Sequence, residues 1–90
     1  YPDAQAVVCF NDVIAYGAIE TMKSQHLEPG KDIAIVGFDD LVDSALMFPA
    51  LTTVHINAQE IAKAVCSALE NKGNQNKTWV NVSLIERESC

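Results

Sequence analysis

Two apolar runs in the first forty positions each end in a pair of polar residues. An Ala-Val-Val-Cys-Phe run precedes Asn11 and Asp12, and an Ile-Ala-Ile-Val-Gly-Phe run precedes Asp39 and Asp40. Their length and β-branched content predict strands buried on both faces, as in a parallel sheet covered by helices. Parallel strands joined by a helix end at the same edge of the sheet, where open α/β sheets bind ligands. We therefore expect Asn11 and Asp39 to emerge at one edge.

The segment between these runs has the pattern of an amphipathic helix over residues 13–25. Apolar residues recur at four-residue intervals and are flanked by two more, so one wide stripe can face the sheet. The stripe consists of Ile14, Ala15, Ala18, Ile19 and Met22. A Glu-Pro-Gly turn follows at 28–30 and ends the helix near His26, which we expect in the left-handed conformation of a helix end.

The polar residues at the strand ends have two interpretations each. A short polar side chain before a helix caps it by accepting hydrogen bonds from the first backbone amides, which is worth about 1 kcal/mol relative to Ala. Asn11 fits both this role and ligand binding, and one of Asn11 and Asp12 can cap while the other faces the cleft. For Asp40 we favour a cap or turn role. Asp39 suits binding, because a carboxylate can accept hydrogen bonds from two hydroxyls of a polyol.

The second half of the chain predicts a loop, a strand, a helix and a final strand. Residues 41–48 form a loop rich in apolar groups, which we expect to pack against the core or a partner chain. A short strand follows at 49–54. Asn57 caps the clearest helix, which ends at the Asn-Lys-Gly-Asn of 71–74, and its stripe is Ile61, Ala64, Val65, Ala68 and Leu69. Residues 79–85 alternate apolar and polar and predict a half-exposed strand near a sheet edge.

Composition narrows the function classes. Ninety residues with 49% apolar content make one small folded unit, and a net charge of −6 with six scattered basic residues argues against a nucleic-acid surface. Three cysteines without a CxxC pair indicate free thiols in a reducing compartment. His26 and His55 lack metal-ligand spacing. We find no catalytic motif, so we expect neither an enzyme, a cofactor nor a metal, and no apolar stretch is long enough to span a membrane.

Five stretches together resemble the C-terminal end of the effector domain of the lac repressor (LacI/GalR) family of bacterial transcription regulators. They cover essentially the whole chain, and their order and spacing are more specific than any single one. The stretches are residues 6–12, residues 15–18 on the helix, residues 33–40, residues 49–54 and residues 84–89.

The resemblance implies an α/β, parallel-sheet, periplasmic-binding-protein-like (type I) fold with a ligand between two subdomains. It places Asn11 and Asp39 at positions that contact the effector, which is usually a sugar or nucleoside-type molecule. It also implies a homodimer formed by the first helix and the loop after the second strand. The interface positions are Ile14, Tyr16, Ala18, Asp43, Ser44, Leu46 and Met47.

The resemblance also implies that the chain is a fragment of a longer regulator. Residues 1–54 then belong mainly to the C-terminal subdomain, residues 55–75 form a crossover helix that packs on the N-terminal subdomain, and residues 76–90 form the final strand. We expect DNA binding only through a helix-turn-helix outside this chain, no membrane partner, and a cytoplasmic location. Because the crossover helix lacks its partner, we expect the fragment to be a dimer or swapped oligomer.

Two positions depart from the family pattern. Ile56 stands where many members carry a Gln that reaches the ligand, so that hydrogen bond is lost or the effector differs. His26 stands where Gly is usual. The alternative function is a periplasmic sugar-binding protein of an ABC transporter, which shares the fold but is monomeric. The apolar loop and the three unpaired cysteines favour the regulator.

Overall fold

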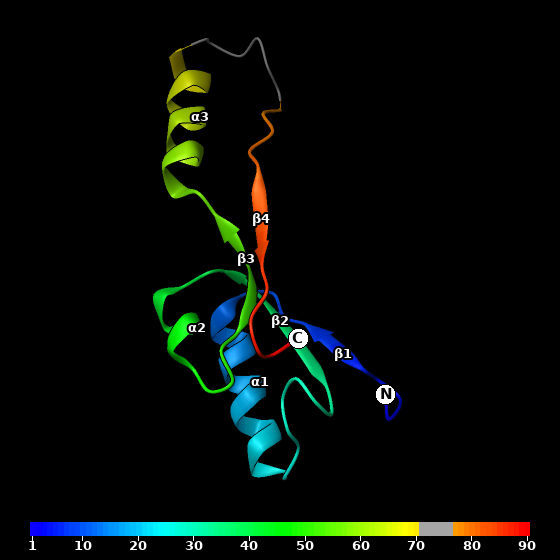
Figure 1. The fold of residues 1–90 in the computed structure, drawn as a ribbon. Helices are drawn as coiled ribbons and strands as arrows, with labels where there is room; N and C mark the ends of the chain where they lie inside the picture. The colour runs from blue at the N-terminus through cyan, green and yellow to red at the C-terminus, as the bar shows by residue number, and fades with distance from the viewer. Residues whose placement is uncertain (71–76) are drawn as a thin grey trace.

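The computed structural model describes residues 1–70 and 77–90, which form a sheet with three helices (Figure 1). The elements alternate as expected for an α/β chain. In chain order they are β1 (Ala6–Val8), α1 (Asp12–Ser24), β2 (Ala34–Asp39), α2 (Val42–Leu46), β3 (Thr52–Ile56), α3 (Ala58–Glu70) and β4 (Val82–Ile85).

The four strands lie in the sheet in the order β1-β2-β3-β4. The first three are parallel, with Val8 opposite Val36, and β4 pairs antiparallel with β3. The backbone amide of Cys9 continues the first pair by donating to the Val36 carbonyl at 2.8 Å. The predicted parallel pair is therefore confirmed, and so is a final strand at the sheet edge.

The core lies between α1 and the sheet. Ala15 and Ile19 of α1 have no exposed surface and pack with Ile35 of β2 and Leu51, which are equally buried. Burying a side chain the size of Ile stabilises the fold by about 1.5–3 kcal/mol, so this cluster fixes α1 on the sheet. The buried face of α1 differs slightly from the predicted apolar stripe, because Ile14, which the sequence placed in the stripe, is 52% exposed.

Two predictions about local structure are wrong. Val7 and Val8 are 39% and 79% exposed, so β1 is not buried on both faces: α1 packs against β2, and no described element shields Val8. The predicted loop at 41–48 contains the short helix α2, whose five residues are too few for a helical period to stand out among the other apolar residues of the segment. His26, in contrast, has the expected left-handed conformation, with a φ of 62°.

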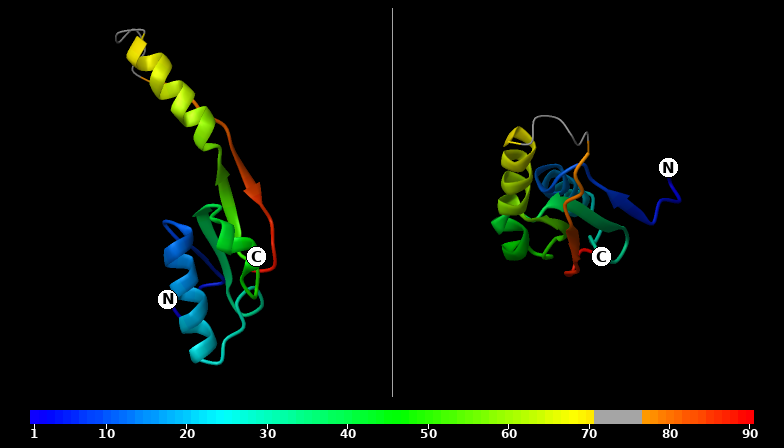
Figure 2. Two further views of the ribbon diagram at one scale, coloured as in Figure 1. Left: turned by 90° about the vertical axis from the view of Figure 1, so that its left-hand side faces the viewer. Right: turned by 90° about the horizontal axis from the view of Figure 1, so that it is seen from above.

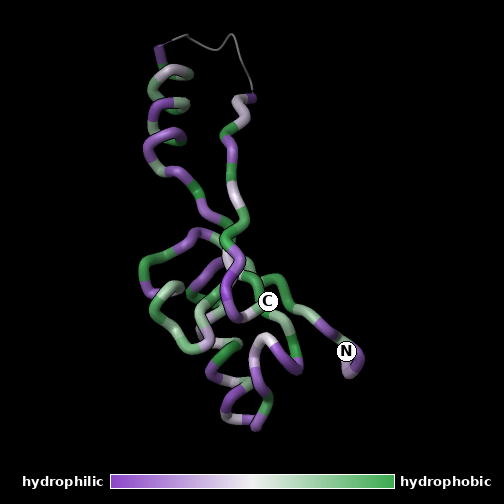
Figure 3. Tube along the Cα trace, viewed as in Figure 1, coloured by the Kyte–Doolittle hydropathy of each residue, from purple (hydrophilic) through white to green (hydrophobic). Residues whose placement is uncertain are grey.

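The helix α3 and the strand β4 extend away from the core (Figures 1 and 2). Asn57 caps α3 as predicted, because its Oδ1 accepts the amides of Gln59 and Glu60 at 3.1 and 3.2 Å. Apolar and polar residues alternate along this helix (Figure 3), yet none of its residues is buried. Its apolar face borders an open hollow of about 290 Å³ shared with residues 77–80. The predicted helix end at 71–74 lies outside the described residues.

The extension gives the chain an elongated shape. Its radius of gyration is 16.5 Å, against about 12 Å for a compact domain of this length. The chain nevertheless returns to the core after β4. There the side chain of Ser89 is fully buried. Its hydroxyl accepts a hydrogen bond from the Thr52 amide at 2.8 Å and donates one to the Ile35 carbonyl at 2.6 Å, which connects β2 to β3.

Candidate functional site

A hollow of about 420 Å³ opens where β1 and β2 end, and its lining comes from the two motifs that the sequence singled out. The lining residues are Phe10 and Asn11 after β1 and Phe38 and Asp39 at the end of β2. Phe10 is 85% exposed and Phe38 is 38% exposed. Two aromatic rings, an amide and a carboxylate are typical of small-molecule sites, in which apolar walls carry a few polar groups. The expectation that Asn11 and Asp39 meet at one edge is confirmed.

Asn11 is both the cap of α1 and a lining residue of this hollow. Its Oδ1 accepts the Ile14 amide at 2.9 Å, and its backbone is extended, as a cap requires. The cap uses the amide oxygen, while the Nδ2 end carries two further donors. The capping bond therefore fixes the side chain, and the two interpretations of Asn11 are compatible.

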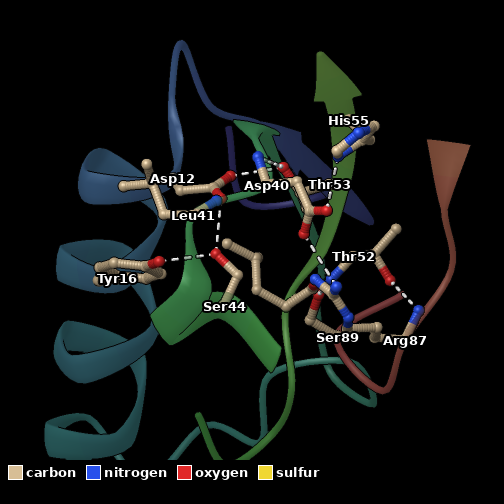
Figure 4. A network of polar contacts seen from close by, with 11 residues as sticks. Asp12, Tyr16, Asp40, Leu41, Ser44, Thr52, Thr53, His55, Arg87 and Ser89 are labelled. Atoms are coloured by element: carbon tan, nitrogen blue, oxygen red, sulfur yellow. Dashed lines mark hydrogen bonds and ion pairs between the residues drawn. The ribbon is translucent and has the colours of Figure 1, made fainter. Parts of the chain in front are cut away.

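Asp12 takes neither of the roles that the sequence suggested for it. It has no exposed surface, and its carboxylate accepts hydrogen bonds from the Leu41 amide at 2.8 Å and from the hydroxyls of Ser44 and Thr53 at 2.5 Å each. Figure 4 shows these groups converging between α1, α2 and β3. A buried carboxylate is costly unless such donors surround it. Asp12 is thus an internal hydrogen-bond acceptor, next in the chain to the lining residue Asn11.

Asp39 and Asp40 adopt backbone conformations that L-residues rarely use. Their φ angles are 118° and 56°. Each such residue costs on the order of 1–3 kcal/mol and persists only where its surroundings hold it. The two side chains have different surroundings: Asp39 lines the hollow, whereas Asp40 bonds to Arg87. The pair therefore does not act as a carboxylate dyad.

Asp40 bridges two basic side chains rather than capping the following loop. Its Oδ1 accepts from Arg87 Nη2 at 2.8 Å, and its Oδ2 lies 2.9 Å from His55 Nδ1 (Figure 4). Burial by itself raises the pKa of this carboxyl, but the hydrogen bonds and charges of Arg87 and His55 outweigh it and hold the pKa below its ordinary value. The cap or turn role favoured for Asp40 is replaced by an ion-pair role.

The sequence did not identify the partners in these networks. His55 lies opposite Asp39 in the register of β2 and β3, so a correct strand alignment would have brought it near Asp40. Arg87 comes from the far end of the chain, and its Nη1 donates a hydrogen bond to the Leu51 carbonyl at 2.9 Å. Ile56, the departure from the family pattern, ends β3 half-buried and is not among the lining residues of the hollow.

The residues expected at a dimer interface divide by exposure. Ile14 and Leu46 are 52% and 76% exposed, and Asp43 is also exposed. Tyr16, Ala18 and Met47 are half-buried. Ser44 has no exposed surface and bonds to Asp12 and to the Tyr16 hydroxyl, the latter at 2.6 Å. Its side chain cannot reach a partner chain, so its role is internal.

Other chemistry is limited in the part of the chain that the structure describes. Across residues 1–70 and 77–90, no group of three or more His, Cys, Asp or Glu side chains is placed to hold a metal ion. No helix in those residues has the length and apolar content needed to cross a bilayer. The three cysteines are free thiols, and burial raises the pKa of Cys9.

Comparisons with known proteins agree with this fold. The family model of the periplasmic binding protein-like domain matches residues 1–90. The chain is 30% identical over 92 residues to the transcriptional regulator MalR of Clostridium butyricum and 31% identical over 81 residues to the transcriptional repressor PurR of Actinobacillus pleuropneumoniae. These matches cover 98% and 90% of the chain but 28% and 24% of the relatives.

The fold is also that of a solved repressor. A crystal structure of the lac repressor dimer, bound to operator and an anti-inducer, superposes with a TM-score of 0.86 at 28% identity. The match covers 94% of this chain and 31% of that one. The fold and the strand-end hollow thus define a periplasmic-binding-protein-like module. The chain belongs to the periplasmic binding protein-like domain family, and the relatives that it matches are LacI-type transcriptional regulators and repressors.

Proposed function

We propose that this chain forms part of the effector-binding and dimerisation domain of a cytoplasmic transcriptional regulator, whose ligand is a sugar or nucleoside-like molecule. The observation that carries the proposal is the hollow at the ends of β1 and β2. Asn11 and Asp39 line it together with two phenylalanines, Phe10 and Phe38. A polar, ring-shaped molecule matches that combination of groups.

The hollow has complementary hydrogen-bonding groups. Asp39 offers carboxylate oxygens that accept from neighbouring hydroxyls, and Asn11 offers amide donors that its capping bond leaves free. The rings of Phe10 and Phe38 supply flat apolar surface for the faces of a sugar or a base. The second wall of the site would come from another subdomain, in line with relatives that are three to four times longer.

Dimerisation is the second part of the proposal. Exposed Ile14 on α1 and Leu46 on α2 lie on two helices that the Tyr16–Ser44 hydrogen bond joins. Apolar side chains gathered in this way suit a self-complementary interface. Asp43 at its edge and the half-buried Tyr16, Ala18 and Met47 would complete it, without Ser44.

Regulation would follow from closing two subdomains around the ligand, which alters the DNA affinity of a helix-turn-helix outside this chain. Such couplings typically amount to about 1–3 kcal/mol. The neighbouring repressor structure holds both operator and anti-inducer, which supports this kind of coupling as the working hypothesis.

The test uses the full-length protein that contains this segment. A thermal-shift screen with lactose, maltose, ribose and adenosine identifies a binding probe, and calorimetry measures its affinity. We expect Asp39→Ala to weaken that affinity at least about tenfold, the size of a lost charged hydrogen bond. Asp3→Ala, an exposed carboxylate at the other end of β1, serves as the control and keeps wild-type affinity. Unchanged affinity in Asp39→Ala would remove Asp39 from the site.

A further inference from the structure

The buried carboxylate of Asp12 joins the parts of the chain that a ligand and a partner would each contact. Its three donors come from the segment after β2, from α2 and from β3: the Leu41 amide, the Ser44 hydroxyl and the Thr53 hydroxyl. Asp12 also directly follows Asn11, which lines the hollow. No described polar side-chain atom in this interior is left without a partner.

The sheet accommodates the Asp12 carboxylate at Gly37 of β2, where no side chain stands in its way. A Cβ added at Gly37 would overlap Asp12 Oδ1 and crowd Leu51 at 3.0 Å. A residue with a side chain at that place in β2 would therefore displace Asp12. The glycine and the carboxylate form a matched pair, which indicates a built-in position and not a chance burial.

We infer that Asp12 is the positioning residue that holds Asp39 in the effector hollow and couples that hollow to α2. The inference rests on the proposed function, because it takes Asp39 as a ligand contact and α2 as part of the interface. Asp12 itself touches neither the ligand nor the partner, since it has no exposed surface.

The backbone between β2 and α2 requires such an anchor. Asp39 and Asp40 are both in positive-φ conformations. The amides that follow them are held from below, because Asp40 donates to Thr53 Oγ1 at 3.3 Å and Leu41 donates to Asp12. Without these bonds the segment would relax toward ordinary φ angles and turn the Asp39 carboxylate away from the hollow.

The same carboxylate fixes α2 against α1. The Ser44 hydroxyl donates its only proton to Asp12, so the Tyr16 hydroxyl must donate to Ser44 (Figure 4). Leu46, two residues further on, is exposed at the proposed interface. A ligand that shifts Asp39 therefore moves the Leu41 amide, and that displacement reaches α2 through one shared carboxylate.

The first test is a double-mutant cycle for probe binding in the full-length protein. Asp12→Asn keeps the shape but turns an oxygen acceptor into a donor that faces donors, so we expect about tenfold weaker binding of the sugar or nucleoside selected above. If Asp12 acts through Asp39, the same change in an Asp39→Ala background costs no further affinity. If the losses of affinity of the two single variants multiply in the double variant, the inference is overturned.

The outcomes separate this inference from the proposed function. If Asp39→Ala weakens binding and Asp12→Asn does not, the hollow stands and the positioning role falls. If Asp39→Ala has no effect, both fall. Should Asp12→Asn fail to fold, Thr53→Val keeps the approximate shape and removes both the hydroxyl donor to Asp12 and the acceptor of the Asp40 amide. We expect a severalfold loss of affinity that also vanishes in the Asp39→Ala background.

A second test needs no ligand. Hydrogen exchange at the Leu41 amide should become faster in Asp12→Asn than the change in global stability accounts for. Ser89→Ala is the matched control, because Ser89 is an equally buried bridge between β2 and β3 whose side chain bonds to Thr52 and Ile35 and not to Asp12. It should change exchange only through global stability. Normal protection of Leu41 in Asp12→Asn would refute the positioning role.

Discussion

Helices α1 and α3 each have 13 residues and an apolar stripe, but only one of them is buried. Ile19 of α1 has no exposed surface, whereas Ile61 of α3 is 39% exposed and Val65 is 53% exposed. The difference lies in what each helix meets: α1 packs on the sheet, and α3 faces an open hollow beside residues 77–80. An amphipathic pattern therefore establishes which face of a helix seeks a partner, but not that the partner is present.

The largest effect should come from truncating the same residue type in the two helices. Ile19→Ala removes a fully buried side chain and should lower the free energy of unfolding by about 2–5 kcal/mol in urea denaturation. Ile61→Ala in the same chain should cost less than about 1 kcal/mol, because the side chain is already partly hydrated. Equal costs would mean that α3 is covered in solution.

Measuring the self-association of the 90-residue chain tests directly whether another chain covers α3. We expect a dimer or swapped oligomer at micromolar concentration, with the apolar face of α3 in the contact. Val65→Glu would bury an unpaired charge there and should weaken association by on the order of 2 kcal/mol, measured by sedimentation equilibrium. A well-folded wild-type monomer in light scattering would contradict this prediction.

The packed region can be tested with two glycines. Gly37→Ala should destabilise the chain by about 1–3 kcal/mol, because the new Cβ meets Asp12 and Leu51. Gly17→Ala, on the outer face of α1 with no heavy atom within 4 Å of the new Cβ, should stabilise it by about 0.5–1 kcal/mol. Thermal unfolding of both variants measures the opposite signs, and a neutral Gly37→Ala would disprove the tight fit.

The pH dependence of stability should report the ion pairs of Asp40, which connect the tail after β4 to the core. The pKa of Asp40 is lower in the folded chain than its ordinary value of 3.8. The charged carboxylate therefore stabilises the fold fully above pH 3.8, and this stability is lost as the pH falls through the pKa of the folded state. Asp40→Asn should cost about 1 kcal/mol at neutral pH and flatten the acid limb of the curve. The exposed Asp3→Asn should leave that limb unchanged.

The smallest perturbation uses the native cysteines. Cys9 is 7% exposed with a raised pKa, while Cys66 on α3 and Cys90 are exposed. Thiol labelling at neutral pH should therefore modify Cys66 and Cys90 quickly and Cys9 slowly. Mass spectrometry of the labelled peptides gives the three rates. Slow labelling of Cys66 would indicate that α3 is covered.

Short-range patterns predicted the candidate site well. The end of each apolar run placed Asn11 and Asp39 at one edge, because parallel neighbours end together whatever packs around them. The same patterns did not reveal α2, because a helix of five residues is too short to show a clear period and the Ser44 hydroxyl bonds connect it to the rest of the fold. They also misjudged β1, because burial depends on whether other elements arrive to cover a strand.

The sequence by itself determined the strands, the two long helices and the two polar residues that line the hollow, Asn11 and Asp39, since alternation, periodicity and capping act between neighbours along the chain. It did not predict that Phe10 and Phe38 also line the hollow. Only the tertiary structure decided that Asp12 is an internal anchor and that Asp40 pairs with Arg87, 47 positions away. Such contacts depend on strand register and on the return of the tail to the core. The free energy of a buried carboxylate is set by the donors that the fold brings to it, whatever their distance in sequence.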